Sequence, residues 1–218
     1  IKECDWSSDV CSSDLAAGIA AYMKKRAMRT VVIGRDARYG SEDFTFESAE
    51  IFSGAGMQVF ILPRPLPTPV LAFATSFLNC DIGIMVTASH NPPMDNGYKV
   101  YVGPRADDVD YRASQIISPT DALMAKEISA ITSLKSQPRG KKWTVLDDEI
   151  FKNYVARTSS LASRPGNLTI VYSAMHGVGT ESVLAVFKAA NFPAPVLVEK
   201  QCTPDPARSE EHTSELQS

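Results

Sequence analysis

Hydrophobic positions along the chain alternate between two spacings. Stretches with apolar residues three or four apart are typical of helices, whereas short apolar or β-branched runs are typical of strands. Ser41 and Thr68 begin two of the helical stretches and are predicted N-caps. The predicted helices cover residues 16–28, 41–53, 68–78, 110–134 with a break at 118–120, 147–161 and 179–190, and the predicted strands cover residues 30–34, 57–62, 81–86, 98–102, 168–173 and 195–199.

Two of these strands define the fold class. Residues 81–86 carry apolar side chains at odd and even positions, which favours a strand buried on both faces of a parallel sheet. Residues 98–102 alternate, with Lys99 on one face and Tyr98 and Val100 on the other, and the Asp-Asn-Gly turn before them predicts an edge hairpin. We therefore expect an α/β protein: an α/β/α layered domain with a mostly parallel sheet and an antiparallel edge hairpin, followed by a partial second α/β domain.

Composition shifts along the chain suggest its domain organisation. The polar stretch over residues 136–142 contains Pro and Gly and predicts a domain boundary near residue 140. Both ends lack the apolar pattern of the rest, look non-native, and resemble translated sequencing-adaptor sequence. The expected organisation is a tail over residues 1–15, a first domain over 16–140, a partial second domain over 141–206 and a tail over 207–218.

Charge and composition narrow the class of protein. The 218 residues are 44% hydrophobic and 22% charged, with a formal net charge of -3 and no long basic stripe, so nucleic acid is not an expected partner. No apolar run reaches the roughly 18 to 20 residues of a membrane span, so no membrane partner is expected either. The four cysteines show no CxxC spacing and are expected to be reduced. We expect a cytoplasmic location.

Ser89 is the first candidate for chemistry. It follows the buried run 81–86, and ligands of parallel α/β sheets bind beyond the carboxyl ends of the strands. A serine hydroxyl needs activation to act as a nucleophile, or it can carry a phosphoryl group between turnovers. The G-x-S-x-G motif of hydrolases is absent, and His90 is a sequence neighbour whose side chain is expected to diverge from Ser89. From residue types alone, a phosphoryl carrier, a hydrolase nucleophile and a loop-capping serine remain open.

The whole motif Thr-Ala-Ser-His-Asn-Pro-Pro over residues 87–93, followed by Asp-Asn-Gly-Tyr-Lys over 95–99, favours the first of these. It resembles the active-site loop of the α-D-phosphohexomutases, the phosphoglucomutase/phosphomannomutase family. Residues 34–38, 67–70 and 172–179 extend the resemblance, which covers roughly residues 16–206. It leans toward the bacterial phosphomannomutase or phosphoglucomutase-2-like branch, which also includes phosphopentomutases.

The resemblance implies a mechanism and roles for three residues. Ser89 would be the phosphoserine that moves phosphate between C1 and C6 of a hexose phosphate through a bisphosphate intermediate, and it would ligate Mg²⁺ through its phosphoryl group. Lys99 would be the general acid/base, and His90 would contact substrate or assist proton transfer. Glucose 1,6-bisphosphate or mannose 1,6-bisphosphate would be the activator, and a hexose or pentose phosphate the substrate.

Weaker candidates lie nearby. Asp36 with Arg35 or Arg38 is expected to pin a loop rather than act in catalysis, and His176 is expected either to meet an anion or to pack at the domain interface. The tyrosines are expected to be surface or rim residues without a cofactor role, namely Tyr98, Tyr101 and Tyr111.

Two family features are missing from the sequence. Residues 1–15 stand where family members carry a glycine-rich segment with an arginine, and an Asp-Gly-Asp-Gly-Asp-Arg type run, which supplies the other metal ligands, is absent. We therefore expect the chain to be a fragment of an intramolecular phosphotransferase with little or no mutase activity of its own. A non-catalytic phosphosugar-binding domain and, less favoured, a serine hydrolase are the alternatives.

Overall fold

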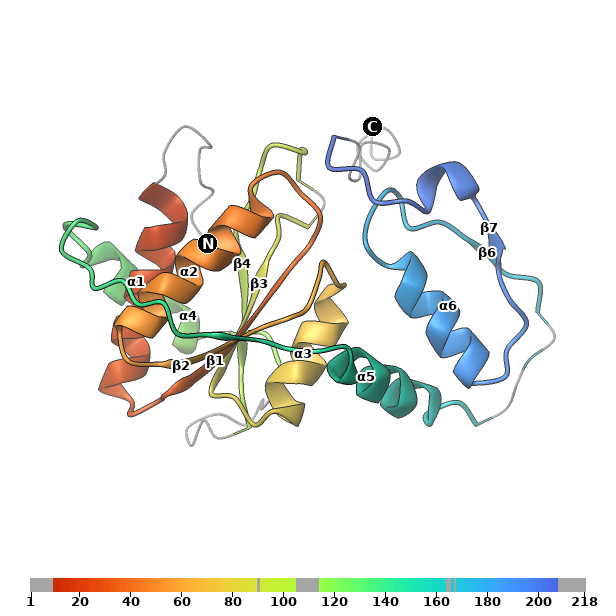
Figure 1. Ribbon diagram of the computed structural model, residues 1–218, viewed down its shortest axis with the longest axis horizontal. Helices are drawn as coiled ribbons and strands as arrows, with labels where there is room; N and C mark the ends of the chain where they lie inside the picture. The colour runs from red at the N-terminus through yellow and green to blue at the C-terminus, as the bar shows by residue number, and fades with distance from the viewer. Residues whose placement is uncertain (1–9, 90, 105–113, 164–165, 167, 208–218) are drawn as a thin grey trace.

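The computed structural model describes residues 10–89, 91–104, 114–163, 166 and 168–207 (Figure 1). In chain order the elements are α1 (Val10–Lys25), β1 (Thr30–Arg35), α2 (Ser41–Gly54), β2 (Gln58–Ile61), α3 (Thr68–Phe77), β3 (Ile82–Val86), β4 (Tyr98–Val102), α4 (Thr120–Ser129), β5 (Thr144–Val145), α5 (Glu149–Ser159), β6 (Val171–Tyr172), α6 (Thr180–Ala189), β7 (Val196–Leu197) and the short 3-10 helix η1 (Glu199–Gln201). None of the helices in these ranges is long and apolar enough to cross a membrane.

A five-stranded sheet organises the first unit. Its strand order is β4-β3-β1-β2-β5, and all neighbours are parallel except β4, which pairs antiparallel with β3 at the edge. Helices α1, α2 and α4 lie on one side of this sheet, and α3 and α5 lie on the other (Figure 1). The predicted α/β/α layers, the mostly parallel sheet and the antiparallel edge hairpin are all confirmed.

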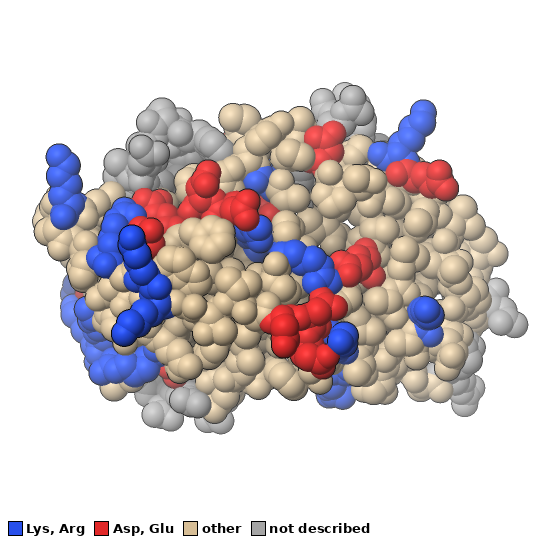
Figure 2. Space-filling view, viewed as in Figure 1, with Lys and Arg blue, Asp and Glu red and all other residues tan. Residues whose placement is uncertain are grey.

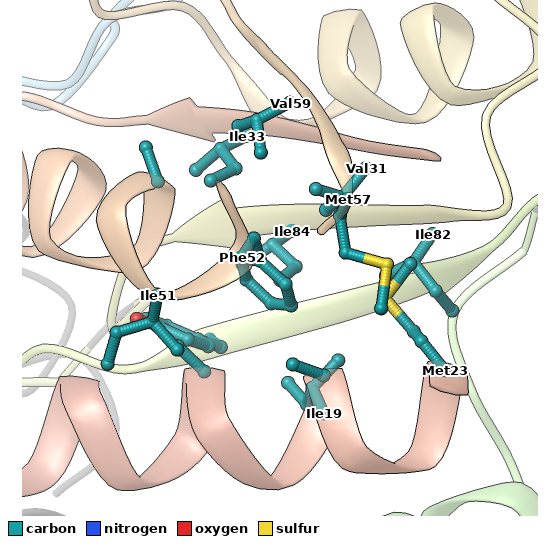
Figure 3. Close-up of a cluster of buried hydrophobic side chains, with 14 of the residues drawn as sticks. Ile19, Met23, Val31, Ile33, Ile51, Phe52, Met57, Val59, Ile82 and Ile84 are labelled. Carbon is teal, nitrogen blue, oxygen red and sulfur yellow. The ribbon is translucent and has the colours of Figure 1, made fainter. Parts of the chain in front are cut away.

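Each face of the sheet buries its own hydrophobic core. Val31 and Ile33 of β1 contribute to the core under α1 and α2, whereas Val32 between them contributes to the core under α3. Figure 3 shows the first core, in which Phe52 of α2 and Ile19 of α1 gather with side chains of the central strands. Strand β3 is buried along its whole length, as its apolar residues at both parities predicted.

Helix α1 begins at Val10 and not near residue 16, so residues 10–15 are part of it and not of the predicted tail. Ser12 and Ser13 are buried, and their hydroxyls donate to the carboxylate of Glu47 on α2. Burial acts to raise the pKa of Glu47, but the hydrogen bonds from these serines and from Arg139 outweigh it and lower the pKa. The partner that makes two serines suitable for burial is 34 residues or more away in sequence, so the local pattern does not reveal it.

The sheet also continues past the predicted domain boundary near residue 140. Strand β5 pairs in parallel with β2, through the register Phe60 to Thr144 and Ile61 to Val145. Arg139, just before it, bonds the carboxylates of Glu47 and Glu50 and fastens this segment to α2. A two-residue strand has no periodicity of its own, which explains why the polar composition alone predicted a linker here.

Three smaller predictions also differ from the structure. Ser41 and Thr68 are the first residues inside α2 and α3, and the N-caps are Gly40, with φ of 71°, and Pro67. Helix α4 covers only residues 120–129 of the helical stretch predicted over 110–134, whose residues 110–113 lie outside the described ranges.

The second unit contains one βαβ motif. Strands β6 and β7 pair in parallel, with α6 between them in sequence. Each strand has two residues, fewer than predicted, and Val171 and Val196 on the pair are exposed. Helix α5 packs against both α3 and α6 and so connects the two units. The prediction of a second α/β unit is confirmed in its element order.

Candidate active site

Ser89 lies three residues beyond the carboxyl end of β3, where ligands of parallel sheets are expected. Its backbone has φ of 57°, in the left-handed region that residues other than glycine rarely adopt. The Ser89 N–H donates to Thr87 Oγ1 at 3.1 Å, and the Thr87 N–H donates to the Gly97 carbonyl at 2.8 Å. These bonds turn the chain sharply after the strand and present the Ser89 side chain to a cavity.

Lys99 is the cation that meets this serine. It sits on β4 opposite Met85 of β3, and its Nζ donates to Ser89 Oγ at 3.1 Å. Tyr98 and Val100 lie on the other face of β4, as the alternating pattern predicted, and they are buried in the core under α1 and α2. As an ammonium, Lys99 can supply a proton to Ser89 Oγ and stabilise negative charge on it, and as a neutral amine it can receive the proton of the hydroxyl.

Arg38 holds the backbone of the serine loop. Only 4% of this residue is exposed, and its guanidinium donates to the carbonyls of Asn91 at 3.0 Å, Pro92 at 2.8 Å and Ser89. Arg38 Nε lies 3.2 Å from Asp36 Oδ2, close enough for an ion pair but not aligned for a hydrogen bond. The structure thus gives Arg38 the loop-pinning role that the sequence analysis favoured.

Asp36, at the end of β1, is the second anchor of the loop. Its carboxylate accepts hydrogen bonds from Thr87 Oγ1 at 2.7 Å, from Ser41 Oγ at 2.7 Å and from the Arg38 N–H at 3.0 Å. Ser41 Oγ in turn accepts from Asn96 Nδ2 at 2.7 Å, which ties the hairpin turn to α2. Thr87 and Asn96 were not singled out from the sequence, although both belong to the motif around Ser89.

The cavity beside Ser89 lies between the two units and has a volume of about 270 Å³, close to the lower end of the roughly 300 to 1,000 Å³ typical of small-molecule sites. Side chains or backbone of both units line it. The first unit contributes Asp36, Ala37, Pro67, Thr68, Pro69, Met85, Thr87, Ser89 and Lys99, and the second contributes Ala174, His176, Gly177, Val178, Gly179 and Asp205.

Arg64 connects the second unit to the first by two ion pairs. Its guanidinium forms ion pairs with Asp148, which precedes α5, and with Glu181 in the first turn of α6, where Nη2 and Oε1 are 2.6 Å apart. The guanidinium carbon also lies 4.9 Å from the ring centre of Phe151. The hydrogen bonds that Arg64 donates to Glu181, and then the one that it donates to Asp148, raise the pKa of Arg64 against the effect of burial. No sequence pattern indicated this contact.

The structure therefore brings together two of the three predicted catalytic residues, Ser89 and Lys99. The third, His90, lies outside the described residues. Tyr98 was predicted to be a surface or rim residue, which is wrong: it is buried, its hydroxyl contacts Ser48 Oγ and donates to the Ser12 carbonyl at 3.1 Å, and burial raises its pKa. Tyr111 lies outside the described ranges.

The predicted metal ligand is Ser89 alone. Within the described ranges, no group of three or more His, Cys, Asp and Glu residues could hold a metal ion. Asp36, the carboxylate tied to the Ser89 loop, already accepts from two hydroxyls and one N–H. The described residues do not by themselves form a Mg²⁺ site, since this cation prefers several oxygen ligands in octahedral geometry.

Comparisons with known proteins agree on one family. The family model for the phosphoglucomutase/phosphomannomutase alpha/beta/alpha domain I matches residues 10–120, just over half of the 218 residues. A Haemophilus influenzae protein named probable phosphomannomutase is 42% identical over 200 residues, which are 90% of this chain and 40% of that protein. A phosphoglucomutase from Staphylococcus haemolyticus is 32% identical over 195 residues, which are 88% of this chain and 35% of that protein.

Solved structures agree on the fold. A crystal structure of a phosphoglucomutase/phosphomannomutase family protein from Burkholderia thailandensis superposes with a TM-score of 0.70 at 24% sequence identity, covering 94% of this chain and 44% of that one. The chain thus spans 35% to 44% of the length of these three proteins. The family match begins at residue 10, where α1 begins, and it includes the serine loop and both strands that position Ser89 and Lys99. The chain belongs to the phosphoglucomutase/phosphomannomutase family.

Proposed function

We propose that this chain is the phosphoserine-bearing part of a phosphohexomutase, an enzyme that moves phosphate between C1 and C6 of a hexose phosphate. In this proposal Ser89 carries the phosphoryl group and a hexose 1,6-bisphosphate is the intermediate. The observation that supports it most is the 3.1 Å hydrogen bond from Lys99 Nζ to Ser89 Oγ, in a cavity at the carboxyl end of β3.

The geometry suits phosphoryl transfer in both directions. In one direction a sugar hydroxyl attacks the phosphorus of phosphoserine and gives its proton to water, the bond from phosphorus to Ser89 Oγ breaks, and the Lys99 ammonium can donate a proton to the departing oxygen. In the reverse step the neutral amine of Lys99 can accept the proton as Ser89 Oγ attacks the phosphorus of a sugar phosphate, the bond from phosphorus to the sugar oxygen breaks, and that oxygen takes a proton from water. Phosphoryl transfer depends mainly on positioning and charge stabilisation, and the bonds from Arg38 and Asp36 to the serine loop supply the positioning.

The proposal includes Mg²⁺ as an ion bound to the phosphoryl group of Ser89. When bound, the ion would neutralise charge on the phosphoryl group of Ser89. Because the described residues do not complete its coordination, we assign it no step here. For the same reason we expect the chain alone to show little or no complete mutase turnover. A cytoplasmic location is part of the same proposal.

Transfer to Ser89 can be tested apart from turnover. The chain is incubated with mannose 1,6-bisphosphate or glucose 1,6-bisphosphate, and the peptide containing residue 89 is analysed by mass spectrometry. We expect one phosphoryl group on Ser89, none on this peptide in Ser89→Ala, and unchanged labelling in Ser76→Ala, which removes an exposed hydroxyl of α3. Lys99→Ala should slow labelling by roughly 100-fold or more, the usual range for a lost general acid/base.

Three outcomes would contradict the proposal. Phosphorylation of another residue with Ser89 unmodified would remove its basis. Labelling of Ser89 by a fluorophosphonate probe would favour a serine hydrolase, and saturable binding of a hexose phosphate without any transfer would favour a non-catalytic phosphosugar-binding domain.

A further inference from the structure

The second unit contributes one wall of the cavity beside Ser89. It consists of the turn between β6 and α6, residues 174–179, together with Asp205. The cavity thus lies between Ser89 and Lys99 on one unit and the beginning of α6 on the other.

His176 is a polar side chain in this wall that has no side-chain hydrogen-bond or ion-pair partner among the described residues. The residue is only 8% exposed, and its backbone is fixed by a hydrogen bond from its N–H to Gln201 at 2.8 Å and by one from the Asp205 N–H to its carbonyl at 3.0 Å. Its imidazole makes no hydrogen bond or ion pair to any residue in the described ranges. In these ranges the fully enclosed side-chain atoms without a hydrogen-bond partner are Arg38 Nε and Ser182 Oγ. The imidazole nitrogens of His176 are not among them, so they remain accessible to solvent.

The amino terminus of α6 begins beside this histidine. The helix has ten residues, its N-cap is Gly179, and no side chain caps it. The hydroxyl of Thr180, which is the first helical residue, donates instead to the Cys202 carbonyl at 2.7 Å. The first N–H groups of a helix have no partner within it, and they carry a partial positive charge that attracts anions.

The charges around the cavity are compatible with an anion. Lys99 reaches it from the first unit, and the Asp36 carboxylate is paired with Arg38. Asp205 is the opposing charge on the second wall, where its Oδ1 accepts the N–H of Ala207 at 2.9 Å. The basic side chains that gather on the face in view in Figure 2 lie at the left end of the first unit, away from the second unit. Anion selectivity therefore has to come from the local arrangement inside the cavity.

We propose that His176 and the first turn of α6 bind a phosphate monoester group in this cavity, so that the second unit supplies half of the phosphoryl-binding site. The imidazole would donate a hydrogen bond to one phosphate oxygen, and the free N–H groups at the helix start would bond others. This inference rests on the proposed function, since it names the unit that faces the phosphoryl group of Ser89 or of the sugar.

Phosphate binding can be measured without any transfer reaction. The whole chain is titrated with inorganic phosphate while NMR spectra record the His176 imidazole and the backbone amides of Val178, Gly179 and Thr180. We expect saturable shifts at all of these positions, and none with mannose, which has no phosphate. Because a hydrogen bond to a charged group is worth about 1.5 to 3 kcal/mol, His176→Ala should weaken phosphate binding roughly 10-fold or more.

Two further variants serve as controls for the phosphate titration. Lys188→Ala removes a cation from the last turn of α6, away from the cavity, and should leave phosphate affinity within about twofold of the wild type. His176→Gln retains a hydrogen-bond donor, so its phosphate affinity should lie between those of His176→Ala and the wild type. This second variant also provides the test if His176→Ala does not fold. Equal phosphate affinity in the wild type and both His176 variants, or shifts of these amides with mannose alone, would overturn the inference.

The same experiment separates this inference from the proposed function. Phosphate binding at His176 with no phosphorylation of Ser89 would leave the inference standing and contradict the mutase proposal. Phosphorylation of Ser89 with no phosphate response at His176 would support the mutase proposal and overturn the inference about His176.

Discussion

Replacement of Arg38 by alanine is the most direct test of how the serine loop is held. The side chain is almost fully buried and donates to three backbone carbonyls of the loop, those of Ser89, Asn91 and Pro92. Arg38→Ala leaves these acceptors without their donor and leaves the Asp36 carboxylate without its ion-pair partner.

The expected loss of stability follows from these contacts. Hydrogen bonds to a charged group contribute about 1.5 to 3 kcal/mol each, but part of that is recovered as the loop relaxes and water enters. Removing one partner of a buried charged network typically costs about 3 to 5 kcal/mol. We expect a loss of unfolding free energy in that range, which corresponds to a drop in Tm of roughly 6 to 20 °C for a chain of this size.

Urea unfolding followed by circular dichroism measures the loss, and hydrogen exchange at Ser89 and Asn91 locates it. Arg35→Ala is the matched control: Arg35 is three residues away, and it pairs at 2.6 Å with the exposed Glu42. An exposed pair of this kind is worth about 0 to 1 kcal/mol. If Arg38→Ala costs no more than Arg35→Ala, or if exchange in the serine loop is unchanged, the reasoning about this network is wrong.

Three further predictions concern other parts of the chain. Glu47→Gln should be less stable than the wild type above about pH 4.5, and the difference in unfolding free energy should narrow as the pH falls through the lowered pKa of Glu47, because protonation removes the carboxylate that the variant lacks. Urea titrations across this pH range measure the difference, and a difference that does not change with pH would contradict the prediction. Arg64→Ala should cost about 1 kcal/mol of unfolding free energy and should increase hydrogen exchange in α6 more than in α2. Equal protection of α6 in the variant and the wild type would argue against Arg64 as the contact that holds the units together. Gly83→Ala should lower stability by about 1 to 3 kcal/mol in thermal melts, since its Cβ would lie 2.0 Å from a buried threonine hydroxyl of α3, and an unchanged Tm would show that this helix can shift freely.

The strands around the site could be predicted because their patterns are local. Apolar residues at both parities in β3 indicated burial on both faces, and the alternation in β4 placed Lys99 on the face opposite Tyr98 and Val100. The antiparallel register brings Lys99 near the end of β3, and the meeting of Ser89 and Lys99 was expected from the resemblance to the family.

Other features depend on partners far away in sequence. Ser12 and Ser13 join α1 because Glu47 accepts their hydroxyls, and the segment after residue 140 joins the sheet because β2 offers an open edge. Tyr98 was expected at the surface, yet it is buried because α1 and α2 cover its face of β4. Such pairings depend on how helices pack on the sheet, and no local periodicity encodes them.

The sequence alone determined the alternation of helices and strands, the position of Ser89 after a buried strand, and the resemblance that places the chain in its family. Only the tertiary structure decided which groups surround that serine. Arg38 and Asp36 pin its loop, and His176 shares its cavity across two units that Arg64 fastens together. The physical reason is that a side chain's periodic neighbours decide whether it is buried, whereas its hydrogen-bond and ion-pair partners are chosen by packing between distant segments.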